Sequence, residues 1–297
     1  MKKVCIIGID TSHATEFPKR FQDPAFEDRA EGIVVTKCMK FLTRFTNPEV
    51  IAQRQAYLES IGVTVTESFE EAVEGCDGIL LELNDPELHV EYFRKCAALG
   101  KPVFLDKPFA DSYVNALEIL KIAKENNTRF YTTSALRYEE NLVQAHNASP
   151  NPHSVHVWAP CGKAPAGSSV IWYGVHALEM LETLMGRGAA TVSAVETPDT
   201  THLTVAYRDG RCASVELHHG FDSGWNYGAL VRDADGKGSC FNCGSEVYTR
   251  ALDAMVRFMN GEEVVSIADS LEVMSILDAA DRAVVSGRTE TVYIKEC

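Results

Sequence analysis

The sequence has no excess of basic residues. Its 28 Lys and Arg stand against 42 Asp and Glu, which gives a formal net charge of −14. Proteins that bind nucleic acid usually carry a clustered basic surface, and anionic membranes attract the same kind of surface. The composition therefore predicts no nucleic-acid partner and no membrane partner, and it leaves small-molecule ligands open.

The sequence also lacks a long apolar run. None of its segments approaches the roughly 18 apolar residues that a membrane-spanning helix needs. The segment Met1–Gly8 combines two lysines with a short apolar stretch, but Asp10 follows almost at once. A signal peptide has a longer apolar region. We therefore interpret Met1–Gly8 as the first strand of a cytoplasmic protein.

The nine cysteines are not spaced like those of a disulfide framework, and their number is odd. Most fall within predicted strands or helices, so we expect reduced, buried thiols rather than disulfides. Cys240 and Cys243 form a single C-x-x-C without a second ligand pair. His202, His218 and His219 lack the compact spacing of a zinc site. No metal site is predicted.

Residues 1–133 alternate between apolar strand patterns and helix patterns, which is typical of a doubly wound parallel sheet. Helix starts are indicated by Asn47-Pro48, by a capping box at Ser68 and by Asp85-Pro86. Six strands are predicted, at 3–7, 33–38, 63–65, 78–83, 102–105 and 129–133. We therefore predict that residues 1–133 form a nucleotide-binding domain of the Rossmann type.

The pattern changes near residue 134. Helices are predicted at 173–185, 247–259 and 271–286, and strands at 191–196, 202–207, 212–218 and 229–233. Asp209-Gly210 and Asp235-Gly236 are typical of hairpin turns. Strands grouped together and helices grouped together indicate an α+β domain. The predicted class is thus α/β, with an α+β domain for substrate binding and oligomerisation over residues 134–297.

The loop after the first strand lacks two of the three glycines of a dinucleotide-binding loop. The G-x-G-x-x-G positions carry Gly8, Asp10 and His13. The loop still follows a strand and opens a helix, where backbone amides bind pyrophosphate. Thr11, Ser12 and His13 are predicted to cap this helix or to donate hydrogen bonds to phosphate. The Asp10 carboxylate would face the phosphate unless it turns away to cap amides.

The sequence also lacks an acidic residue directly after the second strand, where an Asp or Glu would hold the ribose hydroxyls. Lys37 and Lys40 occur there instead. These lysines favour a 2′-phosphate, or they are solvated surface residues. NAD and NADP therefore both remain open as the cofactor.

Four later segments resemble the Gfo/Idh/MocA family of NAD(P)-dependent oxidoreductases. Asp106-Lys107-Pro108 is similar to the family's E-K-P motif, and Asn84 and His89 are similar to polar members of its loop after the fourth strand. Leu136-Arg137-Tyr138 resembles the family's R-[FY] segment. The family's D-x-G-x-H-x-x-D helix start resembles the segment Trp172-Tyr173-Gly174-Val175-His176-Ala177-Leu178-Glu179.

The resemblance implies a Rossmann domain followed by an α+β domain with a large, open, mainly antiparallel sheet. It also implies an oxidoreductase that acts on a C–O bond of a sugar, cyclitol or related small molecule. The family's sheet faces commonly pair, so a homodimer or homotetramer through the C-terminal sheet is expected. The phosphate loop and the resemblance together predict cofactor contacts at Gly8, Asp10, Thr11, Ser12, His13, Lys37, Asn84, His89, Asp106, Lys107 and Pro108.

The resemblance further implies that Lys107 and His176 transfer protons. Lys107 would otherwise be a surface lysine, and His176 an interior histidine with satisfied hydrogen bonds. Glu179 follows His176 by three residues on the same predicted helix face, so it is predicted to orient the imidazole. The predicted substrate contacts are Arg137, Tyr138, Trp172, Tyr173 and Glu179.

Trp172 stands where the family has an Asp that contacts substrate. An indole has no carboxylate to pair with a sugar hydroxyl, but it can stack on an apolar sugar face or lie in the core. Together with the altered glycine loop, this departure leaves a second hypothesis open. The chain would then be a ligand-sensing or regulatory protein that retains the fold without redox turnover.

Overall fold

The first unit of the structure is built on a six-stranded parallel sheet with the strand order β3-β2-β1-β4-β5-β6. The computed structural model describes residues 1–220 and 226–294. This strand order is that of a doubly wound dinucleotide-binding fold, so the predicted Rossmann domain is confirmed. Its strands are β1 (Lys2–Ile7), β2 (Ile33–Met39), β3 (Thr64–Thr66), β4 (Gly78–Leu81), β5 (Val103–Leu105) and β6 (Phe130–Thr132).

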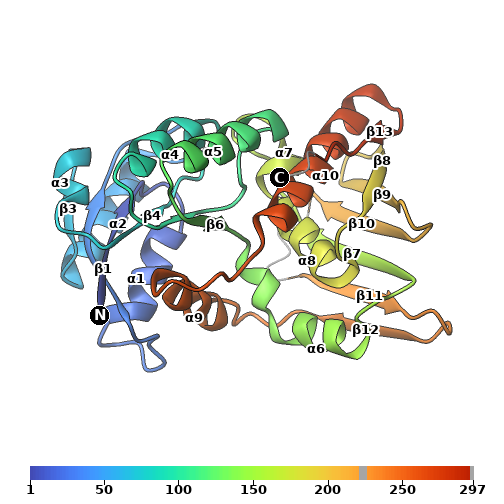
Figure 1. Cartoon of the computed structure of the whole chain (residues 1–297), viewed down its shortest axis with the longest axis horizontal. Helices are drawn as coiled ribbons and strands as arrows, with labels where there is room; N and C mark the ends of the chain where they lie inside the picture. Colours follow the sequence, from blue (N-terminus) through green and yellow to red (C-terminus); the bar gives the residue numbers. More distant parts are fainter. Residues whose placement is uncertain (221–225, 295–297) are drawn as a thin grey trace. The chain divides into compact units, whose positions relative to one another are not determined.

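Helices cover both faces of this sheet. Figure 1 shows α4 and α5 on one side of the strands and α1 and α9 on the other. Buried apolar residues fill β1, β4 and β5 almost without interruption, as expected for strands that are covered on both faces. The helical segments are α1 (His13–Gln22), α2 (Pro48–Ser60), α3 (Phe69–Val73), the 3-10 turn η1 (Pro86–Leu88), α4 (His89–Ala97), α5 (Tyr113–Glu125) and α9 (Tyr248–Met259).

The predicted helix starts are capped as the sequence suggests. The Asn47 side chain accepts a hydrogen bond from the Val50 amide at 3.0 Å, and Ser68 accepts one from the Glu71 amide at 3.2 Å. Asp85 caps the 3-10 turn η1 rather than an α-helix. The α-helix expected directly after Pro86 therefore begins one turn later.

We expect Asn47→Ala to lower the free energy of unfolding by about 1 kcal/mol, because the Val50 amide loses its capping acceptor. Asn47→Asp keeps an acceptor at the helix N-terminus and should retain the stability of the unaltered chain. Urea denaturation followed by circular dichroism measures both variants. Equal destabilisation by Ala and Asp would show that the cap contributes nothing.

The second unit contains a seven-stranded sheet with the order β12-β11-β7-β10-β9-β8-β13. Its neighbouring strands are antiparallel except for the parallel pair β7 and β10. The predicted mainly antiparallel sheet is therefore confirmed. Its strands are β7 (Ser154–Pro160), β8 (Ala189–Glu196), β9 (Thr200–Tyr207), β10 (Cys212–His218), β11 (Gly228–Arg232), β12 (Gly238–Asn242) and β13 (Glu290–Thr291).

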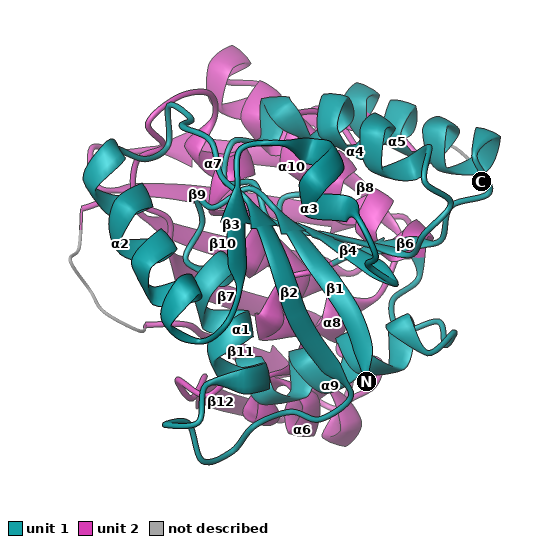
Figure 2. Ribbon diagram, turned by 90° about the vertical axis from the view of Figure 1, so that its left-hand side faces the viewer, with its two compact units in different colours: residues 1–110, 114–132, 248–266 teal, residues 111–113, 133–247, 267–297 magenta. Residues whose placement is uncertain are grey.

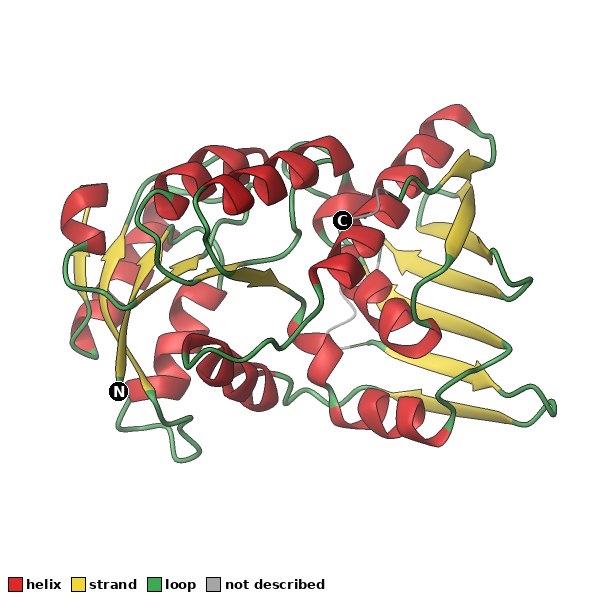
Figure 3. Cartoon of the chain, viewed as in Figure 1, coloured by secondary structure: helices red, strands yellow, loops and turns green. Residues whose placement is uncertain are grey.

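Helices lie against one face of this second sheet, as Figure 3 shows. Along β9, buried side chains alternate with more exposed ones, which is the pattern of a strand with one covered face. Strands β7 and β12 were not predicted, since β7 carries polar residues on its outer face and β12 is a polar edge strand. The helical segments are η2 (Ala135–Tyr138), α6 (Glu140–Ala148), α7 (Ser169–Trp172), α8 (Val175–Met185) and α10 (Ile267–Ser286).

The chain crosses between the units more often than the prediction allows. The first unit comprises residues 1–110, 114–132 and 248–266, and the second comprises 111–113, 133–247 and 267–297 (Figure 2). One crossing lies between residues 132 and 133, and α9 returns to the first unit. There the ring of Phe258 lies 4.6 Å from that of Tyr131, and its carbonyl accepts a hydrogen bond from Arg129.

The eight cysteines in the described part of the chain are free, and six of them are buried. This agrees with the expected reduced thiols. Among the described residues, no helix has the length and apolar character needed to cross a membrane.

Candidate active site

The chain turns sharply at Gly8, directly after β1. Its φ angle is +100°, and a Cβ atom there would lie 2.4 Å from both the Glu82 carbonyl oxygen and Leu83 Cδ2. A side chain is excluded at this position because the loop after β1 runs against the chain that leaves β4. Gly8, the one glycine that the loop retains, therefore stands at a position where only glycine fits. The resulting close backbone cradle suits a dinucleotide.

Asp10, at the second glycine position, turns away from the face that a phosphate would occupy. Its carboxylate accepts hydrogen bonds from the Asn84 backbone amide at 2.9 Å and from the Thr43 hydroxyl at 2.7 Å. Burial raises the pKa of Asp10 despite these donors. The carboxylate thus ties the loop to the segments that follow β2 and β4, and the backbone amide of Asn84 takes part in this contact.

The start of α1 retains the features of an anion site. Thr11 Oγ1 accepts a hydrogen bond from the His13 amide at 3.3 Å, so Thr11 acts as a local cap. Ser12 is exposed, and its side chain makes no capping hydrogen bond. A helix N-terminus attracts anions through its amides and its dipole. Ser12 is therefore the exposed residue at this helix N-terminus, whereas Thr11 is buried.

His13, at the third glycine position, does not point its Nδ1 atom at a phosphate. That atom lies 2.9 and 3.0 Å from the two carboxylate oxygens of Asp106. The ring stacks on Phe17 at 4.7 Å and meets the edge of Tyr248 at 5.5 Å. Because Nδ1 of His13 already binds Asp106, this nitrogen does not act as the predicted hydrogen-bond donor to a phosphate.

The D-K-P segment leaves the sheet at the carboxyl end of β5. The Lys107 amide donates a hydrogen bond to Asp106 at 2.8 Å, and the peptide bond to Pro108 is cis. Although burial by itself would raise it, the charge and hydrogen bond of His13, together with Lys107, hold the pKa of Asp106 at about 2. In open parallel sheets, ligands bind at this edge. Lys107 follows β5 at this edge of the sheet and is 5% exposed.

Two predicted cofactor contacts serve other purposes. His89 is fully buried, with its ring nitrogens 2.9 Å from the Leu83 carbonyl and 3.2 Å from the Phe109 carbonyl. It therefore links the loop after β4 to the chain beyond Pro108. Lys37 Nζ donates to the Glu71 carbonyl and to the Glu74 carboxylate, both at 2.9 Å, as a surface lysine would.

A cavity of about 540 Å³ lies beyond β2 in the first unit. Glu67, from the segment after β3, lies 3.3 Å from Lys40 at this cavity. An acidic residue therefore lies at the end of β2, but it comes from the segment after the neighbouring strand β3. The sequence directly after β2 contains no sign of it. Arg54 was also missed, and its guanidinium donates to the Ile9 carbonyl of the glycine loop at 2.8 Å. The cavity is lined by Lys40, Phe41, Leu42, Pro48, Ile51, Ala52, Gln55 and Glu67.

In the second unit, His176 stands in the first turn of α8. Its Nδ1 atom lies 2.7 Å from the Ser134 hydroxyl, which also accepts a hydrogen bond from the Leu136 amide. The ring faces Tyr173 at 4.7 Å and Tyr227 at 6.0 Å, both edge-on. Ser134 rather than Glu179 is therefore the residue that orients the imidazole.

Arg137 and Glu179, two predicted substrate contacts, bind each other. The Arg137 Nε and a terminal nitrogen each lie 2.6 Å from the same Glu179 oxygen. Thr133 adds a longer hydrogen bond of 3.5 Å to that oxygen. Glu179 is only 3% exposed. The pair thus forms an internal ion pair that joins η2 to α8, and the substrate role of the two residues stays a prediction.

The three aromatic residues predicted near the substrate retain accessible surface. Trp172 and Tyr173 are partly exposed, and their ring centroids lie 5.2 Å apart. Tyr138 is also partly exposed. Partial exposure favours a contact surface over a core position for Trp172.

One turn after Glu179, Glu182 is buried without a hydrogen-bond partner for either carboxylate oxygen in the described chain. Burial, reinforced by the nearby charge of Glu272, raises its pKa well above the ordinary value of 4.5. The folded protein therefore binds a proton at Glu182 that the unfolded chain releases above about pH 4.5. Stability from this group is present at acid pH and is lost as the pH rises toward the raised pKa.

We expect Glu182→Gln to remove this pH dependence. The free energy of unfolding of the unaltered chain should fall relative to that of the variant between about pH 5 and pH 8, by more than about 1 kcal/mol. Urea denaturation at both pH values measures the difference. Glu31→Gln, at an exposed position, is the control and should follow the unaltered chain. Parallel curves for Glu182→Gln and the unaltered chain would contradict the expectation.

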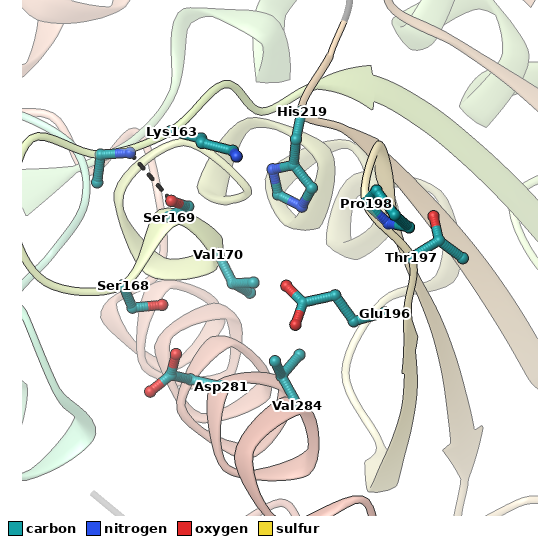
Figure 4. A pocket seen from close by; sticks show the side chains of 11 residues that line it. Lys163, Ser168, Ser169, Val170, Glu196, Thr197, Pro198, His219, Asp281 and Val284 are labelled. Carbon is teal, nitrogen blue, oxygen red and sulfur yellow. Dashed lines mark hydrogen bonds between the residues drawn. The ribbon is translucent and has the colours of Figure 1, made fainter.

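A second cavity, of about 640 Å³, lies in the second unit and contains none of the predicted site residues. Figure 4 shows Lys163, Glu196 and Asp281 around it, together with the His219 ring. That ring is held by the Gly162 carbonyl at 2.8 Å and the Thr201 hydroxyl at 2.7 Å. Charges of both signs line the cavity, so it suits a polar molecule rather than an apolar one.

Residues 2–134 match the model of a family described as the oxidoreductase family with an NAD-binding Rossmann fold. A search among curated proteins finds no significant match.

Solved structures match nearly the whole chain. The myo-inositol dehydrogenase of Lactobacillus casei, solved with NAD(H) and myo-inositol, has a TM-score of 0.81 at 12% identity, covering 100% of this chain and 98% of that one. An oxidoreductase of Agrobacterium radiobacter, solved with NAD+, L-tartaric acid and magnesium, has a TM-score of 0.74 at 15% identity, covering 98% of each chain. An oxidoreductase of Thermotoga maritima has a TM-score of 0.74 at 16% identity, again covering 98% of each. At these identities the likeness establishes the fold.

Proposed function

We propose that this protein belongs to the Gfo/Idh/MocA family of NAD-binding oxidoreductases, whose model residues 2–134 match, and that it oxidises or reduces a C–O bond of a sugar, cyclitol or related small molecule. The observation that carries the proposal is the edge of the first sheet. The glycine loop after β1, the Asn84 amide after β4 and the D-K-P segment after β5 all lie at the carboxyl ends of neighbouring parallel strands. The myo-inositol found with the Lactobacillus casei enzyme is consistent with this substrate class.

The first unit would hold the dinucleotide along this edge. Thr11 and Ser12, at the N-terminus of α1, would bind the pyrophosphate, with Gly8 allowing its close approach. The adenosine end would lie in the cavity beyond β2, beside Lys40 and Glu67. Glu67 can accept hydrogen bonds from ribose hydroxyls, whereas Lys40 can bind a 2′-phosphate. Both NAD and NADP therefore enter the binding test.

The bound nicotinamide would supply the hydride acceptor or donor, and the protein must move the proton of the substrate hydroxyl. Lys107 would bind that hydroxyl through its ammonium group, since its backbone is held by Asp106. His176 would exchange the proton at Nε2, with Ser134 accepting the Nδ1 proton.

The aromatic residues of the second unit would form the surface on which the substrate rests. Trp172 would stack on the apolar face of a sugar or cyclitol ring. Tyr173 would offer its hydroxyl group to the substrate, whereas the hydroxyl oxygen of Tyr138 is buried, so Tyr138 would contact the substrate only through its ring. Because Trp172 replaces a carboxylate, we expect weaker dependence on a substrate hydroxyl at that point than in relatives with an Asp.

Calorimetric titration with NAD(H) and NADP(H) tests the proposed function. We expect one of the two to bind, and Gly8→Ala to weaken binding at least about tenfold, because its Cβ would collide with the Glu82 carbonyl. Gly238→Ala is the control, since a Cβ there would lie 3.6 Å from its nearest neighbour. Failure of both nucleotides to bind at millimolar concentration would overturn the proposal.

The helix-free face of the second sheet is the surface we propose for a homodimer or homotetramer. Its exposed positions include His202 and Thr204 on β9 and Leu230 on β11. Light scattering after gel filtration measures the oligomeric state, and a monomer at micromolar concentration would contradict this assignment.

A further inference from the structure

In the first unit, three side chains of types that bind metal ions lie close together beside the loop that follows β1. His13 comes from the start of α1, Glu82 follows β4, and Asp106 follows β5. One potential ligand atom from each lies within 4.8 Å of the other two. All three side chains are buried, with exposures of 7%, 0% and 0%. The same strand ends that form the nucleotide edge thus also enclose a small cluster of one imidazole and two carboxyl groups.

Glu82 is the unusual member of this cluster. Neither of its oxygens accepts a hydrogen bond from an N–H or O–H donor in the described chain, and burial, together with the neighbouring Asp106 carboxyl group, raises the pKa of Glu82. Asp10 adds a further negative charge nearby, against the positive charges of His13 and Lys107. A buried carboxylate without donors is expensive unless a cation compensates it. A cation held by Glu82 and Asp106 would provide this compensation, as a proton on Glu82 would in its absence.

We propose that His13, Glu82 and Asp106 form a binding site for a divalent transition metal ion of the zinc or manganese type. One imidazole and two carboxylates suit these ions, since imidazole favours zinc and carboxylates favour manganese. The double positive charge balances the two carboxylates and leaves His13 neutral. This proposal concerns the first unit alone and does not depend on the proposed redox function.

The spacing of the cluster is close to that of a metal centre. Zinc binds nitrogen and oxygen ligands at about 2.0–2.2 Å in tetrahedral geometry, so two ligands of one ion lie about 3.4 Å apart. A contraction of at most about 1.4 Å brings the ligand atoms, now within 4.8 Å, to that separation. The contact of 2.9 Å between His13 and Asp106 must open slightly to admit the ion. Three protein ligands leave at least one further coordination position.

Metal content and metal titration of the full chain test the site. The purified protein is treated with a chelator, desalted and titrated with Zn²⁺ or Mn²⁺ alone, and retained metal is measured by mass spectrometry. We expect about one ion per chain, and binding at least about 100-fold weaker in Glu82→Gln and in His13→Ala. His156→Ala is the control, because His156 lies in the second unit and bonds to Ser214. It should bind as the unaltered chain does.

Electron paramagnetic resonance of the unaltered chain tests the site even if a variant does not fold. Bound Mn²⁺ should show ¹⁴N coupling from one imidazole in pulsed electron paramagnetic resonance, and this coupling should be absent in His13→Ala. No binding of either ion at millimolar concentration by the folded chain would overturn the site. Undiminished binding in Glu82→Gln would also overturn it, since the ion would then lie elsewhere. In either case a proton shared between Glu82 and Asp106 replaces the metal.

Discussion

Replacement of Lys107 by methionine is expected to lower kcat/KM at least about 100-fold, the usual loss when a residue that assists proton transfer is removed. Methionine keeps the length and the apolar stem of the side chain but removes the ammonium group. The backbone of residue 107 should stay in place, because its amide still donates to Asp106. The measurement follows NADH formation or consumption with a panel of sugars and cyclitols that includes myo-inositol.

A matched control separates this effect from a general loss of positive charge. Lys124→Met changes an exposed lysine of α5 in the same unit and should leave turnover unchanged. NAD(H) affinity of Lys107→Met, measured by calorimetry, should fall far less than kcat/KM. Undiminished turnover in Lys107→Met would remove the residue from the mechanism. If no substrate supports turnover while a metabolite raises the Tm, the ligand-sensing hypothesis is favoured instead.

Replacement of Arg137 by methionine is expected to lower the free energy of unfolding by about 3–5 kcal/mol, the usual result of breaking a buried ion pair from one side. The reason is the partner that remains. Glu179 is 3% exposed, and its remaining hydrogen bonds, from the Ser134 backbone and the longer one from Thr133, cannot compensate a full charge. Urea denaturation measures the loss, and circular dichroism of the native state checks that the variant folds.

The double variant Arg137→Met with Glu179→Gln isolates this effect. Because no uncompensated charge remains, it should recover more than half of the stability that Arg137→Met loses. A loss of less than about 1 kcal/mol in the single variant would indicate that water reaches Glu179. Similar losses in the single and double variants would indicate that packing of Arg137, rather than its charge, supports η2 and α8.

Features that depend on nearby residues were predicted well. The Asn47 cap and the Ser68 cap act over three residues, and the hairpin turns at Gly210 and Gly236 have the positive φ angles that glycine allows. Strands β1, β4 and β5 were predicted because a strand covered on both faces is apolar along its length. Polar edge strands such as β12 have no such pattern and were missed.

The assignment of α9 could not follow from a local pattern. Residues 247–259 were correctly predicted as a helix, but amphipathicity shows only that one face is buried. It does not show which sheet receives that face. Contacts of Phe258 with Tyr131 and Arg129 decide this in the structure, and those partners lie more than a hundred residues earlier in the chain.

The sequence by itself determined the fold class, most helix and strand positions, the glycine loop and the D-K-P segment, because local propensity and short-range periodicity encode them. Only the tertiary structure decided how the polar side chains of the site are used. His13 meets Asp106 across 93 positions of sequence, Arg137 meets Glu179 across 42, and His89 turns inward to two carbonyls. A residue's type shows that it can bind an anion, a substrate or a metal ion. Which partner the residue binds depends on which strand ends lie next to one another in the fold. A local sequence pattern does not contain that information.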